Sequence, residues 1–400
     1  MLDFVNLSLL LSTMAGARFY FDVGNYVTML RLVRAEPDRG RRRKLLAAFL
    51  IGVPAMAAIH AICFALDPLL FPSLRRTEVR EPVFCVGHAR SGTTYLHRLM
   101  ARDDQFSVVL MYEMFFPSLL EKRLLRLLFR ADEVLFGKRL RHRIDAIEER
   151  AFAETNDMHR TGFFAAEEDD FLLTWSLGSG FWIVLFPYLG QLDFYHVDRW
   201  SERKRRRLMT FYAECVRRQV ALNGGRTHLS KNPTFCGRVE SLIETFPDAK
   251  FIVPMRNPYE TIPSLLKMLQ TTWQLQGRDE RLILESIRIL ADQSFDSYCH
   301  PLDVLARHPE IRSCVVDYRD LVGEPAATMR RVYDELDLDL PPDVAAAISA
   351  SRGQGHETTH RYSLEEFGLD PQAIHVRLAP LFDQFGWSNE GHEGEHAGVN

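Results

Sequence analysis

Cysteine and lysine are scarce in this chain of 400 residues. Its six cysteines include no C-x-x-C pair and no spacing typical of a Cys/His metal site, which excludes a disulfide-stapled scaffold and a zinc module. Buried free thiols in a reducing compartment are the simplest interpretation. Only seven of the 49 basic residues are lysines, but a bias toward arginine can reflect genomic base composition and indicates no function by itself.

An excess of charge of one sign is also absent. The 49 basic and 53 acidic residues give a formal net charge of −4, whereas a dedicated nucleic-acid binder is usually basic, so no nucleic-acid partner is expected. With 46% hydrophobic and 26% charged residues, the chain is not wholly disordered, collagenous or coiled-coil. Its length suggests two or three structural units.

One long hydrophobic run, residues 45–66, follows a basic cluster and is long enough to cross a bilayer. An earlier apolar segment, residues 2–32, is not expected to be a secretory signal, because Asp3 replaces the basic start that such a signal needs. Three arrangements of this region are compatible with the pattern: a spanning helix, a pair of interfacial helices, or helices that cover a soluble domain. We expect residues 1–78 to form a hydrophobic, helical, membrane-associating region.

Short apolar strands alternate with helices from residue 81 onward. The predicted strands are 82–86, 106–110, 250–255, 313–316 and one that begins at 228, and the predicted helices are 91–101, 118–150, 201–222, 238–245, 263–270 and 326–335. This alternation predicts an α/β fold of three layers, in which a parallel sheet is flanked by helices. The predicted domain covers residues 79–387, and the polar tail 388–400 is expected to be disordered.

The strongest local signal is a strand, a glycine-bearing loop and a helix between residues 84 and 96. Backbone N–H groups from Ser91 to Thr94 would converge on an anion at the positive end of the helix dipole. Gly87 and Gly92 have the spacing of the nucleoside-triphosphate loop, but Thr93 stands where that motif needs lysine. The cation is instead Arg90, within the loop, which suits a phosphate ligand handled without a metal ion.

A second strand-to-helix junction follows residues 250–255. Arg256 stands where this strand should end, which is the usual ligand edge of an open parallel sheet. Ser264 lies eight residues further on, just inside the next predicted helix. The two side chains could hold a second phosphate, one by a charged fork and the other by its hydroxyl.

In this order and separation, the two junctions resemble the 5′- and 3′-phosphosulfate-binding motifs of sulfotransferases, especially the bacterial and tyrosylprotein-type branches. Further similar segments are residues 228–233, 246–251, 318–322 and 360–368, so the resemblance covers about residues 80–387. It implies transfer of a sulfonate group from 3′-phosphoadenosine-5′-phosphosulfate (PAPS) to a hydroxyl, with no metal required. The nucleotide-binding residues that it implies are His88, Arg90, Ser91, Gly92, Thr93, Thr94, Arg256, Ser264 and Tyr318.

Sulfonate transfer needs a base for the acceptor proton and cations for the transferring group. The predicted base is Glu113, which follows the second strand among apolar neighbours and resembles the glutamate base of the tyrosylprotein-type branch; His88 and His159 are held in reserve. Lys231 and Arg90 are assigned to the sulfonate and the leaving group. The acidic run 167–170 could hold a metal, but an acidic helix N-terminus is the favoured interpretation.

The acceptor is expected to be an amphiphilic or lipid alcohol or a hydrophobic phenol, because residues 1–78, 163–164 and 181–188 supply much apolar surface; alternatively, these segments are core. Two other functions stay open: a P-loop nucleotide kinase or hydrolase, and a catalytically inactive membrane-surface nucleotide-binding protein. The expected location is the cytoplasmic side of a membrane, peripheral or monotopic, with a single-pass protein as the alternative.

Overall fold

A five-stranded parallel sheet forms the centre of the computed structural model, which describes residues 18–151, 162–350 and 363–387. The strand order is β2-β3-β1-β4-β5, and every pairing among these strands is parallel. The strands are β1 (Val83–Cys85), β2 (Phe106–Ser107), β3 (Thr227–Lys231), β4 (Lys250–Met255) and β5 (Ser313–Asp317). Carboxyl ends of parallel strands share one edge, so the loops after β1, β3 and β4 meet there.

Helices cover both faces of the sheet. Successive residues of β4 and β1 alternate between two cores: Phe84 and Phe251 belong to one, and Cys85 and Ile252 to the other. The first core is closed by α9 (Glu202–Leu222), α10 (Val239–Thr245), α11 (Pro258–Leu275) and α12 (Glu280–Arg307). The second is closed by α5 (Thr93–Met100), α14 (Pro325–Glu335) and α15 (Pro342–Ser349). The predicted three-layer α/β fold is therefore confirmed.

Two helical predictions were wrong. The single helix expected over residues 118–150 is divided at Gly137, whose φ of 59° is left-handed, into α6 (Leu119–Phe136) and α7 (Arg139–Ala151). The helix expected over 263–270 begins earlier, at Pro258, because Asn257 caps it by accepting a hydrogen bond from the Tyr259 N–H. The 28-residue α12, with Pro301 inside it, was not predicted.

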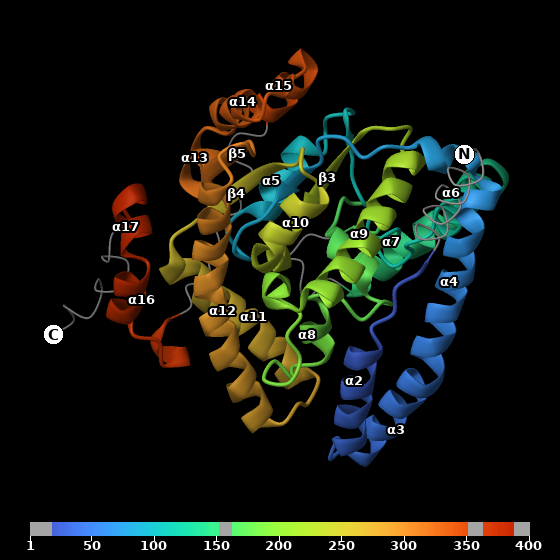
Figure 1. The fold of residues 1–400 in the computed structure, drawn as a ribbon, viewed down its shortest axis with the longest axis horizontal. Coiled ribbons are helices and arrows are strands. Elements are labelled where there is room, and N and C mark those ends of the chain that lie inside the picture. Colours follow the sequence, from blue (N-terminus) through green and yellow to red (C-terminus); the bar gives the residue numbers. More distant parts are fainter. Residues whose placement is uncertain (1–17, 152–161, 351–362, 388–400) are drawn as a thin grey trace, which may run out of the picture.

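The N-terminal region is helical and packs on the rest of the chain. After α2 (Val23–Ala35), one continuous helix consists of α3 (Arg39–Ala47), the π-helical segment η1 (Ala48–Gly52) and α4 (Val53–Leu70). Phe49 packs on Trp182 and Phe186, so much of the aromatic stretch 181–188 is core. Figure 1 shows α4 along one side of the molecule, opposite α16 (Pro371–Arg377) and α17 (Ala379–Phe385). The predicted tail 388–400 lies outside the described residues.

Candidate active site

The loop between β1 and α5 is shaped by close backbone approach. A Cβ atom at Gly87 would lie 2.7 Å from the carbonyl oxygen of Pro254 in β4, and one at Gly92 would overlap the ring of Tyr318. Gly92 precedes α5 with a φ of 92°, and Arg90 also has a positive φ, 73°. The loop is thus held against β4 on one side and against Tyr318, the first residue of α13 (Tyr318–Gly323), on the other.

The second junction meets this loop. The Arg90 Nε atom donates to Ser264 Oγ over 3.2 Å, and Arg256 Nη1 donates to the Arg90 carbonyl over 3.4 Å. The Arg256 guanidinium lies 4.5 Å from the centre of the Tyr318 ring and pairs with Glu260 at 2.5 Å. Four of the predicted nucleotide ligands therefore converge at the carboxyl edge of the sheet: Arg90, Arg256, Ser264 and Tyr318.

His88, also in the loop, is supported by α12. Its ring stacks on Tyr298 with 5.0 Å between the centroids, and the Tyr298 hydroxyl donates to the Arg256 carbonyl over 2.7 Å. Burial lowers the pKa of His88 to about 4, so the imidazole is neutral at physiological pH. His88 is consequently a weaker base than an ordinary histidine. His159, the other reserve base, lies outside the described residues.

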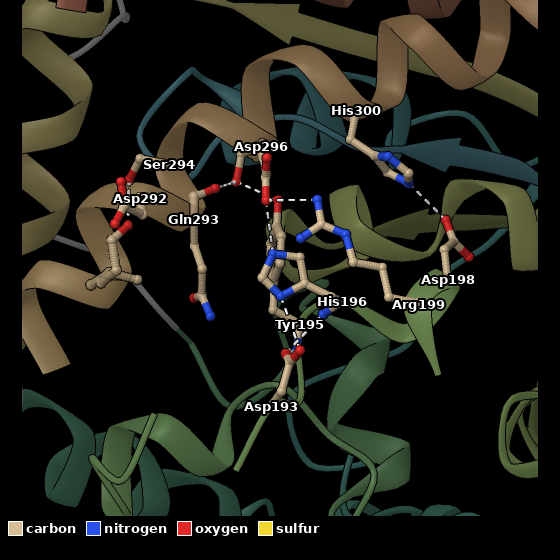
Figure 2. A network of polar contacts seen from close by, with 12 residues as sticks. Asp193, Tyr195, His196, Asp198, Arg199, Asp292, Gln293, Ser294, Asp296 and His300 are labelled. Carbon is tan, nitrogen blue, oxygen red and sulfur yellow. Dashed lines mark hydrogen bonds and ion pairs between the residues drawn. The ribbon is translucent and has the colours of Figure 1, made fainter. Parts of the chain in front are cut away.

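A polar network on another side of α12 fixes this helix to the segment around the 3₁₀-helix η4 (Val197–Arg199). His196 lies between Asp193 and Asp296, with Nδ1 3.0 Å and Nε2 2.9 Å from their carboxylates, and Arg199 also reaches Asp296 (Figure 2). Burial alone would lower the pKa of His196, but hydrogen bonds to the two carboxylates raise it above its ordinary value. The network thus joins α12, the helix that also carries Tyr298, to the segment around η4.

Lys231, at the end of β3, lies next to the first turn of α5. Its Nζ atom is 2.7 Å from Glu168 Oε1 and 3.4 Å from Thr94 Oγ1. The Lys231 side chain is fully covered, whereas that of Glu168 is 12% exposed. Burial raises the pKa of Glu168, and the neighbouring ammonium group of Lys231 opposes this rise. The lysine is thus a buried cation beside the glycine loop, paired with a largely buried carboxylate.

The acidic run 167–170 stands at the N-terminus of a 3₁₀-helix, η3 (Asp169–Leu173), which is the interpretation favoured by the sequence. Its side chains are in addition buried against β3 and the segment that follows. Asp169 is hydrogen-bonded to His228, Ser230, Asn232 and Tyr212, and Asp170 is paired with Arg238 at 3.1 Å. The alternation of His228, Ser230 and Asn232 along one face of a strand was the signal that could have revealed this anchor.

Glu113 is completely buried in a separate set of contacts. Its carboxylate accepts hydrogen bonds from Arg126 Nε (2.8 Å), Gln219 Nε2 (2.9 Å), the Tyr112 hydroxyl (3.1 Å) and the Leu110 N–H (3.3 Å). These donors come from α6, α9 and the segment after β2. The role of Glu113 as the base stays a prediction. Glu168, which sequence reasoning did not select, contacts Lys231 directly.

A parallel sheet with a glycine loop at a helix N-terminus, and a second arginine–serine junction beside it, defines a P-loop-like α/β fold. The profile of the Sulfotransferase family matches residues 82–342, so the chain belongs to that family.

Curated relatives and solved structures agree with this assignment. Over 271 residues the chain is 29% identical to the omega-hydroxy-beta-dihydromenaquinone-9 sulfotransferases Stf3 of Mycobacterium bovis and Mycobacterium tuberculosis. The match covers 64% of this chain and 63% of each relative, so it spans less than two thirds of their length.

The fold resembles sulfotransferase STF9 from Mycobacterium avium, with a TM-score of 0.66 and 18% identity over 94% of this chain and 95% of the other. It also resembles STF1 from Mycobacterium tuberculosis, with a TM-score of 0.64 and 21% identity over 90% and 94%.

Proposed function

We propose that the protein transfers a sulfonate group from PAPS to the hydroxyl of a lipid-like alcohol. The observation that carries this proposal is the meeting of Arg90, Ser264 and Arg256 at one edge of the sheet. A single phosphate needs one such group of donors, whereas a nucleotide phosphorylated at both 5′ and 3′ positions needs two adjacent ones. We assign one of these groups to the loop and the other to the β4–α11 junction.

The loop residues fit such a nucleotide. Ser91 Oγ and His88 Nε2 are buried and have no hydrogen-bond partner among the described residues, and an anionic oxygen would satisfy the hydroxyl. Thr93 and Thr94 would add the N–H groups of the first turn of α5. Arg256 and Ser264 would hold the 3′-phosphate, and Tyr318 would flank it.

PAPS, when bound, supplies a sulfonate whose bond to a phosphate oxygen is easily broken. In the transfer, an O–S bond forms at the acceptor oxygen, the S–O bond to the phosphate breaks, and the acceptor proton passes to a carboxylate. Lys231 and Arg90 would offset the negative charge that grows on the leaving phosphate oxygen. Because Lys231 is fully covered by protein, its charge acts with little screening by water.

Two carboxylates are candidates for the base. Glu113 is supported by the family resemblance. Glu168 is supported by its contact with Lys231 and its raised pKa. Comparison of the pH–rate profiles of Glu113→Gln and Glu168→Gln decides between them.

The acceptor is proposed from the relatives, because the names of both curated relatives specify a hydroxylated menaquinone derivative. A lipid-like alcohol also suits the exposed apolar N-terminal helix. We place the protein on the cytoplasmic side of a membrane, as a peripheral or monotopic enzyme with access to cytosolic PAPS.

Binding of adenosine 3′,5′-bisphosphate tests the proposal. Arg256→Ala and Ser264→Ala should each weaken binding by about tenfold or more, because each removes a ligand of the 3′-phosphate. Arg206→Ala, an exposed arginine of α9 paired only with Glu202 among the described residues, is the matched control and should bind like the parent. Unchanged binding by both site variants would refute the site.

A further assay tests the chemistry. Omega-hydroxy-beta-dihydromenaquinone is the first acceptor to try, followed by comparison of lipid extracts for a sulfonate mass increment. Magnesium-dependent ATP turnover would instead favour a P-loop kinase or hydrolase, although Thr93 replaces the lysine such enzymes need. Nucleotide binding without transfer to any acceptor would favour the inactive binding protein.

A further inference from the structure

The long N-terminal helix over residues 39–70 leaves one face uncovered. Every exposed side chain between residues 47 and 70 is apolar, and only 22% of the most apolar 18-residue window is buried. The large side chains on this face, with exposed fractions from 37% to 70%, include Leu50, Ile51, Ile59, Ile62, Leu66 and Leu69. At about 1.5 Å per residue the stripe is roughly 35 Å long. Soluble monomers rarely expose such a surface.

The opposite face of the same helix is covered by protein. Phe49, Val53 and Phe64 are buried, and His60 Nδ1 lies 2.6 Å from Glu121 Oε1 of α6. Near the end of α4, Asp67 pairs with Arg218 of α9 at 2.7 Å, and both side chains are almost completely buried. The helix therefore lies along the domain. If it crossed a bilayer in this arrangement, it would carry the charged helices α6 and α9 into the hydrocarbon layer.

Helix α6 adds further apolar surface next to α4. Leu124 and Leu128 are 55% and 51% exposed, and they lie about one and two turns beyond Glu121 on the same side of α6. Glu121, like Leu119 and Leu120, contacts α4, so these leucines extend the uncovered surface beyond the single helix.

Positively charged side chains stand at both ends of the stripe. Arg39, Arg43 and Lys44 are exposed at its start, and Arg75 and Arg76 are exposed just after its end. Cations beside an apolar helix face match the anionic headgroups that lie above the acyl chains of a membrane. A second copy of the chain fits less well, because pairing two stripes in either direction would bring basic ends together.

We infer that the outer face of residues 47–70, together with Leu124 and Leu128, is a docking surface for an anionic phospholipid bilayer. The helix lies in the interfacial plane with its apolar side chains among the acyl chains, and Arg39, Arg43, Lys44, Arg75 and Arg76 contact the headgroups. This deepens the proposed membrane placement, but it requires neither the donor nor the acceptor to be correct.

Flotation of the full chain with vesicles tests the surface. The vesicles contain phosphatidylcholine alone or with one third phosphatidylglycerol. The parent should float with the anionic vesicles, and Ile62→Asn with Leu66→Asn should weaken this binding by about tenfold or more. Arg75→Gln with Arg76→Gln should weaken it only on anionic vesicles and mainly at low salt. Val376→Asn, an equally exposed apolar position on α16, is the matched control and should leave flotation unchanged.

Binding of adenosine 3′,5′-bisphosphate, measured on the same samples, separates the possible failures. If the double variant Ile62→Asn with Leu66→Asn binds the nucleotide like the parent, it is folded. A loss of its flotation then supports the docking surface. Flotation of that variant like the parent would overturn the inference, as would a stable dimer that the same substitutions dissociate. Flotation without nucleotide binding by the parent would refute the proposed function and leave the surface standing.

Discussion

Gly92 occupies a position where no side chain has room. Its φ of 92° is left-handed, and a Cβ atom there would overlap the ring of Tyr318, which itself lies against Arg256. Gly92→Ala should therefore displace Tyr318 and weaken the binding of adenosine 3′,5′-bisphosphate by about tenfold or more. Titration calorimetry measures this affinity. The control is Gly137→Ala, where φ is 59° and a Cβ meets nothing within 4 Å. It should cost about 1 kcal/mol of stability and leave binding intact.

At the scale of single residues, Glu168 is also a candidate for the base that accepts the proton of the acceptor hydroxyl. Glu168→Gln should lower kcat by about a hundredfold or more and leave nucleotide binding nearly unchanged, because it removes the base but not the ligands. It should also abolish the acid limb of the pH–rate profile. In the parent this limb should lie above the ordinary glutamate range, since burial raises the pKa of Glu168.

Glu113→Gln is the comparison for this experiment. It leaves Arg126 without its anionic partner, so its main expected effect is a lower free energy of unfolding, with the pH profile unchanged in shape. If Glu113→Gln removes the acid limb and Glu168→Gln does not, Glu113 is the base and Glu168 only positions Lys231.

At the scale of elements, a buried ion pair helps to anchor α4 to the domain. Asp67 accepts from Arg218 Nε at 2.7 Å and from the Leu119 and Leu120 N–H groups at the start of α6. Asp67→Ala should lower the free energy of unfolding by about 1–3 kcal/mol in a denaturant titration, because it leaves Arg218 Nε and the two N–H groups without their acceptor, whereas Arg218 keeps its pair with Glu214. Arg206→Gln, which breaks an exposed pair in α9, should change it by less than about 1 kcal/mol. Similar effects from both variants would contradict the anchor.

The contact between η4 and α12 should make stability depend on pH. The pKa of His196 is raised in the folded protein, so its contribution is fully present below the unfolded value of about 6.5 and is lost as the pH rises through the folded pKa. The pKa of Asp193 is lowered by its hydrogen bonds with His196 despite burial, so its own contribution is lost as the pH falls through that lowered pKa. Thermal unfolding of the parent and of His196→Gln between pH 6 and 9 measures the contribution of His196 to stability. Identical pH dependences of the Tm in the two proteins would refute that contribution.

The sequence predicted elements well where one signal dominated. The apolar runs of β4 and β5 and the glycine loop were located within a few residues, because burial on both faces leaves little choice of side chain. The division at Gly137 was missed, because the leucine spacing of α6 outweighed one glycine. The contacts of residues 167–170 with β3 and Asn232 were missed, because they join segments about 60 residues apart and only the alternation of His228, Ser230 and Asn232 indicated them.

For the whole molecule, the predicted site residues fall into two groups. Arg90, Arg256, Ser264 and Tyr318 converge because parallel strands bring their carboxyl ends to one edge, a rule that needs only strand order. The base does not follow from that rule. Glu113 and Glu168 both lie outside the strands, and only the packing of the segments after β2 and before η3 decides what each contacts.

Nucleotide binding should stabilise the whole fold, because its proposed ligands come from β1–α5, β3, β4–α11 and α13, which are distant in sequence. Adenosine 3′,5′-bisphosphate at about a hundred times its Kd should add about 2.7 kcal/mol and raise the Tm measured by calorimetry. The rise should persist in excess EDTA, because Arg90, Arg256 and Lys231 supply the positive charge, and it should be much smaller in Arg256→Ala. A rise that disappears with EDTA would show that a metal ion takes part in binding.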